Sequence, residues 1–203
     1  MAIEEMMKNA SPNMMEYEIE AYYDYVLTKN GVTDKAFKTI AASGKNGCTL
    51  HYSKNNCKTH DGDLILVDAG AQYKWYNGDI TRTFPVNGKF TEKQKEVYNI
   101  VLNGQKLIID TIKEGVEYPY LNEKLKDYYF EELSKLGLVK TKEDVFNYYF
   151  HNVSHFLGAE THDVGERKQT LKAGMVITVE PGLYIEEWGI GIRIEDDVLV
   201  TKD

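Results

Sequence analysis

Apolar residues in the first part of the chain recur at the spacing of helices and then at the spacing of a strand. Residues 1–10 have a helical pattern, which Ser11-Pro12 interrupts. A second helix is predicted by apolar positions at helical spacing, namely Met15, Ile19, Tyr22, Tyr23 and Val26. Asn30-Gly31 ends it. Residues 37–42 then predict a short strand, and a glycine-rich turn follows through residues 43–47.

Two apolar segments further on each carry an aspartate. Leu66-Val67-Asp68-Ala69-Gly70 has the composition of a buried strand, and residues 78–84, with Asp79, predict a second strand. The short intervening segment, residues 72–77, predicts a loop between two adjacent antiparallel strands. An aspartate in an apolar strand is costly to bury unless something pairs with it. These two aspartates therefore indicate a functional site.

Helices and further strands are predicted for the rest of the chain. Thr91-Glu92-Lys93-Gln94 is a capping-box pattern that opens a long helix, and a second helix over residues 121–136 ends at Gly137. An apolar run over residues 175–185 predicts a strand broken by a Pro-Gly pair, and residues 189–200 predict the last strand. Strand pairs thus occur twice with helices between them. This order predicts an α+β fold with a mostly antiparallel sheet and two related halves.

Composition and charge exclude several classes of protein. The 203 residues suit a single domain, and a net charge of −8 without a basic patch argues against a nucleic-acid partner. No apolar run is long enough to span a membrane, and the N-terminus has no signal-peptide pattern. Cys48 and Cys57 are too few for a disulfide framework, so we interpret them as reduced thiols in a cytoplasmic protein.

Further candidate functional groups lie downstream. Three of the five histidines, His151, His155 and His162, fall in one short segment, and Glu180 and Glu195 sit at the end of or within apolar strands. A lone histidine is more often a surface residue, and Glu195 could instead pair with a neighbouring arginine on an exposed face. A nucleophilic serine beside His155 is a weak alternative, because no strained elbow motif surrounds it.

Metal binding accounts for these groups together. Four carboxylates and one imidazole, with no thiolate, suit Mn²⁺, Co²⁺, Fe²⁺ or Zn²⁺ and exclude a structural thiolate zinc site. Four carboxylates also balance the charge of two divalent ions. We therefore expect Asp68, Asp79, His155, Glu180 and Glu195 to bind a metal pair that generates a hydroxide nucleophile.

Several sequence blocks identify a resemblance that covers essentially the whole chain. It resembles the catalytic domain of Xaa-Pro aminopeptidase (aminopeptidase P), in the superfamily of creatinase, prolidase and methionine aminopeptidase. The blocks that carry this resemblance are residues 46–52, 63–70, 78–90, Ser154-His155-Phe156-Leu157-Gly158, Val179-Glu180-Pro181-Gly182-Leu183-Tyr184 and residues 189–197. Phe156 stands where many members of the family have tryptophan.

The resemblance implies a pita-bread fold of two pseudo-symmetric halves, with a curved sheet covered by helices around a dinuclear centre. It assigns Asp68 to one metal, and Asp79 and Glu195 to positions that bridge both. His155 and Glu180 complete the other metal site. Glu180 is also expected to take a proton from the bridging water. The resemblance favours Mn²⁺ as the metal.

Four further residues receive roles from the resemblance. His51 corresponds to the histidine near the scissile nitrogen, and His162 to the one that stabilises the developing oxyanion. His151 and Arg193 correspond to groups that orient the substrate and the ligands. His60 has no counterpart and is expected at the surface.

The implied function is release of the N-terminal residue from peptides with proline at the second position. A prolidase that cleaves Xaa-Pro dipeptides is the enzymatic alternative, and a methionine aminopeptidase fits the Asp79 and His155 blocks less well. The alternative from another class is a non-catalytic peptide-binding module. We expect residues 1–203 to be one metallopeptidase catalytic domain without the family's N-terminal domain. The full-length protein is expected to form a homo-oligomer.

Overall fold

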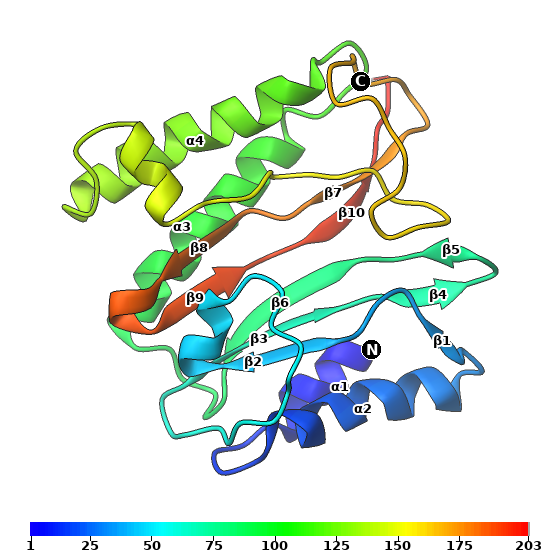
Figure 1. The fold of residues 1–203 in the computed structure, drawn as a ribbon, viewed down its shortest axis with the longest axis vertical. Helices are drawn as coiled ribbons and strands as arrows, with labels where there is room; N and C mark the ends of the chain where they lie inside the picture. Colours follow the sequence, from blue (N-terminus) through cyan, green and yellow to red (C-terminus); the bar gives the residue numbers. More distant parts are fainter. Residues whose placement is uncertain (203) are drawn as a thin grey trace.

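The first half of the chain places two helices against a three-stranded sheet. The computed structural model describes residues 1–202. Figure 1 shows the two N-terminal helices below the strands that follow them. The elements of this half are α1 (Ala2–Asn9), α2 (Glu16–Lys29), β2 (Ile40–Ser43), β3 (Leu64–Ala69) and β6 (Ile80–Pro85). The two predicted helices are confirmed, and so are the two adjacent strands of the aspartate-bearing segments.

The second half of the chain contains two longer helices and four strands. Its elements are α3 (Glu92–Ile109), α4 (Tyr118–Lys135), β7 (Val176–Val179), β8 (Gly182–Ile185), β9 (Ile190–Arg193) and β10 (Asp196–Leu199). In Figure 1 these helices lie on the far side of the strands from α1 and α2, so the strands of both halves are enclosed between two helical layers. The predicted break at Pro181-Gly182 separates β7 from β8 and is confirmed.

Every strand pairing within residues 1–202 is antiparallel. β3 lies between β2 and β6, with Asp68 opposite both Ile40 and Thr81. In the second half β7 pairs with β10 and β8 pairs with β9. The predicted α+β class with antiparallel sheets is therefore confirmed.

Local sequence signals explain where the two long helices begin and end. The Thr91 hydroxyl accepts a hydrogen bond from Gln94 N, and Thr91 N donates to the Gln94 side chain, as the capping box predicts. α4 begins three residues before the predicted position, because Pro119 suits the first turn of a helix. Gly137, which follows this helix, has a φ of 72°, the left-handed conformation expected of a C-terminal glycine.

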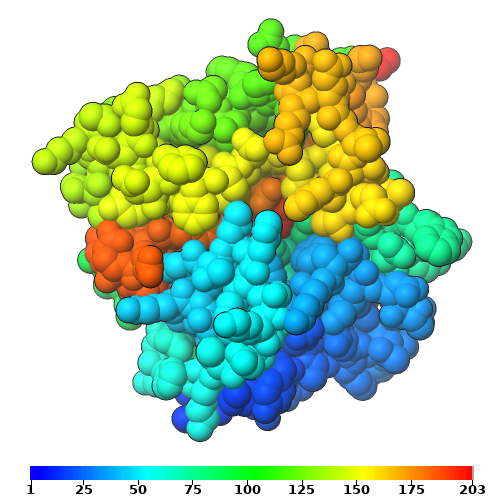
Figure 2. Space-filling model, in the orientation of Figure 1, coloured from blue at the N-terminus to red at the C-terminus, as the bar shows by residue number. Residues whose placement is uncertain are grey.

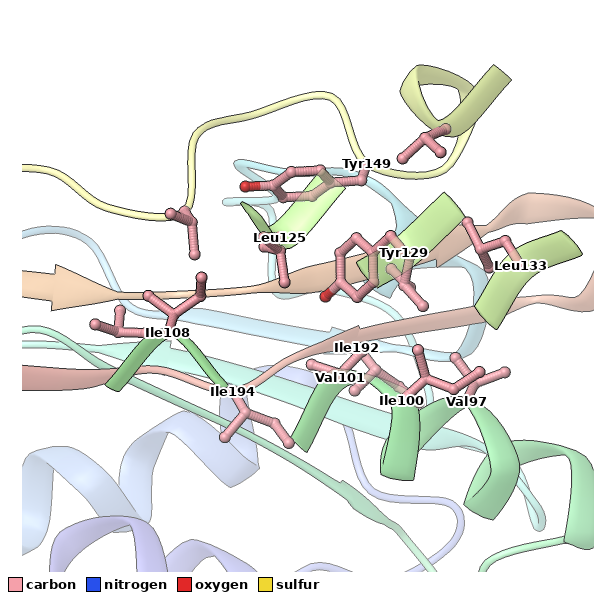
Figure 3. Packing of buried hydrophobic residues seen from close by; sticks show 14 of the residues in the cluster. Val97, Ile100, Val101, Ile108, Leu125, Tyr129, Leu133, Tyr149, Ile192 and Ile194 are labelled. Carbon is pink, nitrogen blue, oxygen red and sulfur yellow. The ribbon is translucent and has the colours of Figure 1, made fainter. Parts of the chain in front are cut away.

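The larger hydrophobic core lies between α3, α4 and the strands of the second half. Figure 3 shows Val97, Ile100 and Val101 of α3 beside Ile192 of β9, with Tyr129 of α4 packed above them. A smaller core joins α1 and α2 to β3 and β6. The two cores leave the polar ends of the strands to form the site.

One predicted loop is wrong. Residues 72–77 form a small hairpin, in which β4 (Ala71–Tyr73) pairs with β5 (Tyr76–Asn77) and with β1 (Asp34–Lys35), a strand that the sequence did not predict. The two turn residues, Lys74 and Trp75, have φ of 51° and 67°. Hairpin turns of this kind normally carry Asn-Gly, so no turn signal is visible at Lys74-Trp75.

The single last strand predicted over residues 189–200 is also wrong. It is divided into β9 and β10, which pair with different partners, and Glu195 lies at the break. The glycine-rich turn is a short 3-10 helix, η1 (Gly44–Cys48), and two more occur as η2 (Glu143–Asn147) and η3 (Glu186–Trp188). Among residues 1–202, no helix combines the length and apolar character needed to cross a membrane.

Candidate metal centre

All nine predicted site residues line one cavity of about 270 Å³. They are His51, Asp68, Asp79, His151, His155, His162, Glu180, Arg193 and Glu195. The cavity lies between the two halves of the fold. Figure 2 shows the cyan segment around residue 50 and the yellow segment around residue 155 next to each other on one face of the molecule. The structure thus brings together every site residue that was predicted from the sequence.

The ends of strands position the four carboxylates. Asp68 lies in β3, whereas Asp79 directly precedes β6 instead of lying within the strand. Glu180 lies between β7 and β8, and Glu195 between β9 and β10. Because these positions fall at strand ends and breaks, the side chains turn out of the sheets and into the cavity.

Backbone hydrogen bonds hold the irregular segment that carries His155. Thr178 N donates to His155 O at 3.0 Å, and His155 N donates to the Thr178 hydroxyl at 3.0 Å. Glu180 N also donates to Val153 O at 2.9 Å. His155 is therefore fixed against β7 although its own segment has no regular secondary structure.

Three of the five candidate ligands already lie in a cluster. Ligand atoms of Asp79, His155 and Glu195 all lie within 4.8 Å of one another. His155 Nε2 is 3.4 Å from Asp79 Oδ2 and 3.7 Å from Glu180 Oε1. One imidazole nitrogen thus faces two carboxylates across a small space.

The buried oxygen atoms around this space fit a cation. Asp68 Oδ1, Asp79 Oδ1 and Glu195 Oε1 are buried and have no hydrogen-bond partner. Buried carboxylate oxygens are normally paired, because an unpaired one loses its hydration without compensation. Three such atoms in one cavity are the donor set that hard divalent cations require. The residues present therefore fit a metal site.

The hydrogen bond at Nδ1 directs the other ring nitrogen of His155 toward the candidate ligands. Its Nδ1 lies 3.0 Å from Phe156 O, and because a carbonyl can only accept, Nδ1 carries the proton. Nε2 faces Asp79 and Glu180. Burial lowers the pKa of His155, but the hydrogen bond to Asp79 and the charge of Glu180 outweigh it and raise the pKa, so a bound cation would take the place of the Nε2 proton. A backbone carbonyl on the second ring nitrogen is a usual partner of metal-binding histidines.

Burial strongly perturbs the carboxylates of the cavity. It raises the pKa of Asp79 to about 6 and that of Glu180 to about 7, and raises the pKa of Glu195 well above the usual range. The nearby negative charges add to this effect, while His155 opposes it at Asp79 and Glu180. Four acidic groups this close together need positive charge for all to be ionised.

Arg193 supplies part of that positive charge through a chain of hydrogen bonds. Its Nη2 donates to Asp68 Oδ2 at 2.6 Å, and its Nη1 donates to the Tyr184 hydroxyl at 2.8 Å. The Tyr184 hydroxyl lies 2.9 Å from His151 Nε2, and His151 Nδ1 lies 2.8 Å from Asn152 O. The Asn152 carbonyl only accepts, so Nδ1 holds the proton and Tyr184 donates to Nε2. Neutral His151 is thus linked to Asp68.

His51 and His162 stand at the more exposed rim of the cavity. The His162 ring centre is 4.5 Å from that of His155 and 6.4 Å from that of His51. Burial and then the charge of His155 lower the pKa of His162. A second cavity of about 520 Å³ shares these two rim histidines with Asp68 and Asp79. The rim therefore separates two spaces that meet at the candidate ligands.

The structure decides between the alternative interpretations of several residues. Arg193 is only 2% exposed and bonds to Asp68, so an exposed Arg–Glu pair with Glu195 is wrong. The buried Ser154 hydroxyl has no hydrogen-bond partner, so it lacks the base that a nucleophilic serine needs. The His60 side chain is 74% exposed, as expected.

Three hydroxyl groups of the site were not predicted. The Thr81 hydroxyl donates to Glu195 Oε2 at 2.7 Å, and Thr178 and Tyr184 hold His155 and His151 as described above. Their side chains project from strands that have ordinary apolar composition. A threonine opposite a strand aspartate, as Thr81 is, was the one available sequence signal.

The comparison with known families gives a match along nearly the whole chain. Residues 1–202 match metallopeptidase family M24. The chain belongs to metallopeptidase family M24. The predicted resemblance is therefore confirmed. This M24 chain is 42% identical over its full length to the Xaa-Pro aminopeptidase of Escherichia coli (strain K12), and 38% identical over 99% of its length to Xaa-Pro aminopeptidase 3 of Rattus norvegicus.

Solved structures agree with this assignment. A Bacillus anthracis structure assigned to aminopeptidase P superimposes on the M24 chain with a TM-score of 0.97 at 52% identity. Zn-substituted Escherichia coli aminopeptidase P in complex with product gives a TM-score of 0.94 at 41% identity, over 99% of this chain. The M24 chain spans 50% of the Escherichia coli enzyme's sequence and 48% of the Bacillus anthracis chain.

Proposed function

We propose that residues 1–203 are the catalytic unit of a metal-dependent aminopeptidase that releases the N-terminal residue from peptides with proline second. The observation that carries this proposal is the convergence of four buried carboxylates and His155, with three carboxylate oxygens lacking any partner. The relatives named Xaa-Pro aminopeptidase support the choice of substrate.

Two divalent ions are the proposed cofactor, with Mn²⁺ as the proposed metal. Asp68 would hold one ion, His155 and Glu180 the other, and Asp79 and Glu195 both. The unpartnered oxygens of Asp68, Asp79 and Glu195 support this assignment. When bound, the ions supply Lewis acidity toward the scissile carbonyl and a nucleophile at neutral pH.

Glu180 and His162 are the proposed proton and oxyanion groups. Glu180 faces the candidate ligands, with Oε1 3.7 Å from His155 Nε2 and Oε2 3.8 Å from His151 Nδ1, so its carboxylate would be placed to accept a proton from water held there. His162 stands at the rim, where an imidazole N–H can donate to an oxygen that becomes negative. His51, on the other side of the rim, would lie near the scissile nitrogen.

His151 and Arg193 are proposed to orient the site. Arg193 fixes one oxygen of Asp68, so the other oxygen is directed to the metal. His151 receives a hydrogen bond from Tyr184 and presents its ring edge to Glu180, with Nδ1 3.8 Å from Glu180 Oε2. The two residues, joined through the Tyr184 hydroxyl, would thus hold Asp68 and Glu180 in place.

We also infer that the two halves are pseudo-symmetric and form the curved sheet of a pita-bread fold. Each half has two helices, antiparallel strands and two of the four acidic candidates. A peptide with proline at the second position is the proposed partner. Homo-oligomer formation by the full-length protein and a cytoplasmic location stay predictions.

The test is an assay of Xaa-Pro-Xaa tripeptides with Mn²⁺, using the full-length protein and this chain. We expect release of the first residue, and its loss in Asp79→Ala. His60→Ala is the matched control because the exposed His60 lies outside the cavity. No release by the full-length protein, or release that Asp79→Ala leaves unchanged, would contradict the proposal.

Two other outcomes identify the alternatives. Turnover of Xaa-Pro dipeptides without turnover of tripeptides would identify a prolidase. Absence of turnover together with less than one bound Mn²⁺ per chain in equilibrium dialysis would favour a peptide-binding module. The unpartnered carboxylate oxygens argue against this last outcome, because a site that had lost its metal would have no use for them.

A further inference from the structure

A fully buried acid lies outside the metal site. Glu16, in the first turn of α2, has an exposed fraction of 0%. Its Oε1 accepts hydrogen bonds from Ser43 N at 2.8 Å, the Ser43 hydroxyl at 2.7 Å and Asn46 Nδ2 at 2.8 Å. Its Oε2 accepts from the Tyr52 hydroxyl at 2.7 Å and from Cys57 N at 2.9 Å. One carboxylate thus receives five hydrogen bonds.

The neighbours of Glu16 require an ionised carboxylate. Every one of the five groups donates, and no ion pair to this residue occurs within residues 1–202. Burial by itself would raise the pKa of Glu16, but the hydrogen bonds from Asn46 and Ser43 outweigh it and lower the pKa. A neutral side chain of the same shape would carry a donor of its own, and that donor would face the donors of the neighbouring groups.

The five hydrogen bonds enclose the segment that carries His51. Ser43 and Asn46 precede His51 in the chain, Tyr52 follows it directly, and Cys57 lies beyond. Tyr52 is buried in a small cluster with Ile40, Ala42, Leu66 and Tyr184, while the adjacent His51 is exposed to the cavity. Glu16 therefore fixes the backbone on both sides of His51.

The same segment rests against the strand that carries Arg193. A Cβ atom on Gly191 of β9 would lie 2.1 Å from Gly47 O, so only glycine allows this approach. The segment is thus held between Glu16 on one side and β9 on the other. Any shift at the Glu16 side changes the distance from His51 to the metal ligands.

His51 has no fixing contact of its own. Within residues 1–202 its side chain makes no hydrogen bond, and the His162 ring lies 6.4 Å away between centres. We infer that Glu16 is a positioning residue that places His51 over the reacting peptide through Tyr52 and the backbone of residues 43–57. This inference rests on the proposed aminopeptidase function.

The test compares Glu16→Gln with Glu18→Gln in the Mn²⁺-loaded full-length protein. Glu18 is an exposed acid on the same helix, so its variant makes the same charge change without touching the segment. We expect Glu16→Gln to lower kcat/KM for an Xaa-Pro-Xaa peptide roughly ten- to a hundred-fold, because small displacements of catalytic groups have effects of this size. Glu18→Gln should leave kcat/KM unchanged.

A double-mutant cycle separates positioning from general damage. In a His51→Ala background, Glu16→Gln should cause less than about a twofold further loss, because the residue it positions is already gone. The His51 ring signals in NMR spectra should shift in Glu16→Gln and not in Glu18→Gln. Losses that multiply fully in the double variant, or unshifted His51 signals, overturn the inference.

A milder variant covers the case in which Glu16→Gln does not fold. Tyr52→Phe removes one donor to Glu16 and keeps the packed ring. It should lower kcat/KM in the same direction by a smaller factor, again with little further loss in the His51→Ala background. If the wild-type protein is active and Glu16→Gln and Tyr52→Phe are unaffected, the inference about Glu16 is refuted and the proposed function stands. If the wild-type protein is inactive, the proposed function is refuted.

Discussion

Arg193 Nη2 lies 2.6 Å from Asp68 Oδ2, and this contact ties β9 to β3 across the candidate metal centre. Arg193 is only 2% exposed, and it also donates to Tyr184 and Thr81. Taking a guanidinium group out of water is costly unless it is paired and hydrogen-bonded. The arginine meets that requirement with a carboxylate that is itself a proposed metal ligand, so stability and metal binding share one residue pair.

Replacing Arg193 should therefore destabilise the fold. We expect Arg193→Met to lower the free energy of unfolding by about 3–5 kcal/mol, because Asp68 is left as a buried charge without its partner. Lys135→Met is the control, since the exposed Lys135 pairs with Glu132 at the surface and its loss should cost no more than about 1 kcal/mol. Urea unfolding measures both. Similar losses of unfolding free energy in the two variants would show that the buried Arg193–Asp68 pair stabilises the fold no more than a surface pair does.

Metal loading should stabilise the protein through the same cavity. The burial of four carboxylates is offset when cations bind, so Mn²⁺ should raise the melting temperature and a chelator should reverse the rise. At a metal concentration of about 100 Kd the gain is about 2.7 kcal/mol. Differential scanning fluorimetry with and without Mn²⁺ measures it. Asp79→Ala should abolish the shift and His60→Ala should preserve it; a shift that survives in Asp79→Ala would place the ions elsewhere.

The site residues could be predicted because they are charged side chains in or beside apolar segments. Asp68 in an apolar strand and Glu180 after one are costly unless something compensates them, and that cost is visible in the sequence alone. The capping box at Thr91 was equally readable, since its two hydrogen bonds are local. A single sequence thus carries two signals: the free-energy cost of burying a charged residue in an apolar segment, and hydrogen bonds between residues that are close in the chain.

Other features depended on contacts between distant segments. Tyr184 links Arg193 to His151, yet nothing in its own strand distinguishes it from a core tyrosine. The break at Glu195 arises because β9 and β10 pair with different strands, and strand pairing between distant segments cannot be read from residues 189–200 alone. Glu16 was missed for the same reason, because its five donors come from residues 43–57.

The neutral state of His151 should make stability depend on pH. Burial, followed by the charge of Arg193, lowers the pKa of His151 to about 3, against roughly 6.5 in an unfolded chain. This contribution is fully present above about pH 6.5 and is lost progressively as the pH falls toward 3, because only the unfolded state takes up the proton.

His151→Gln should weaken this dependence. Between pH 7 and 5, the wild-type protein should lose about 2 kcal/mol more unfolding free energy than the variant. Urea unfolding of metal-free protein at each pH gives the difference, and His60→Gln, at an exposed position, should follow the wild type. Parallel curves for wild type and His151→Gln would mean that His151 takes up its proton at the same pH in the folded and unfolded states, which contradicts the prediction.

The β4–β5 turn offers a test that is independent of the site. Trp75 has a φ of 67° and is 83% exposed, so its side chain strains the backbone and has little packing to compensate. Trp75→Gly should raise the free energy of unfolding by roughly 0.5–1 kcal/mol, the relief of strain being partly offset by the entropy of glycine. Trp75→Ala, which keeps the strain, should give no such gain in thermal unfolding. Equal gains in both variants would assign the effect to loss of the exposed ring.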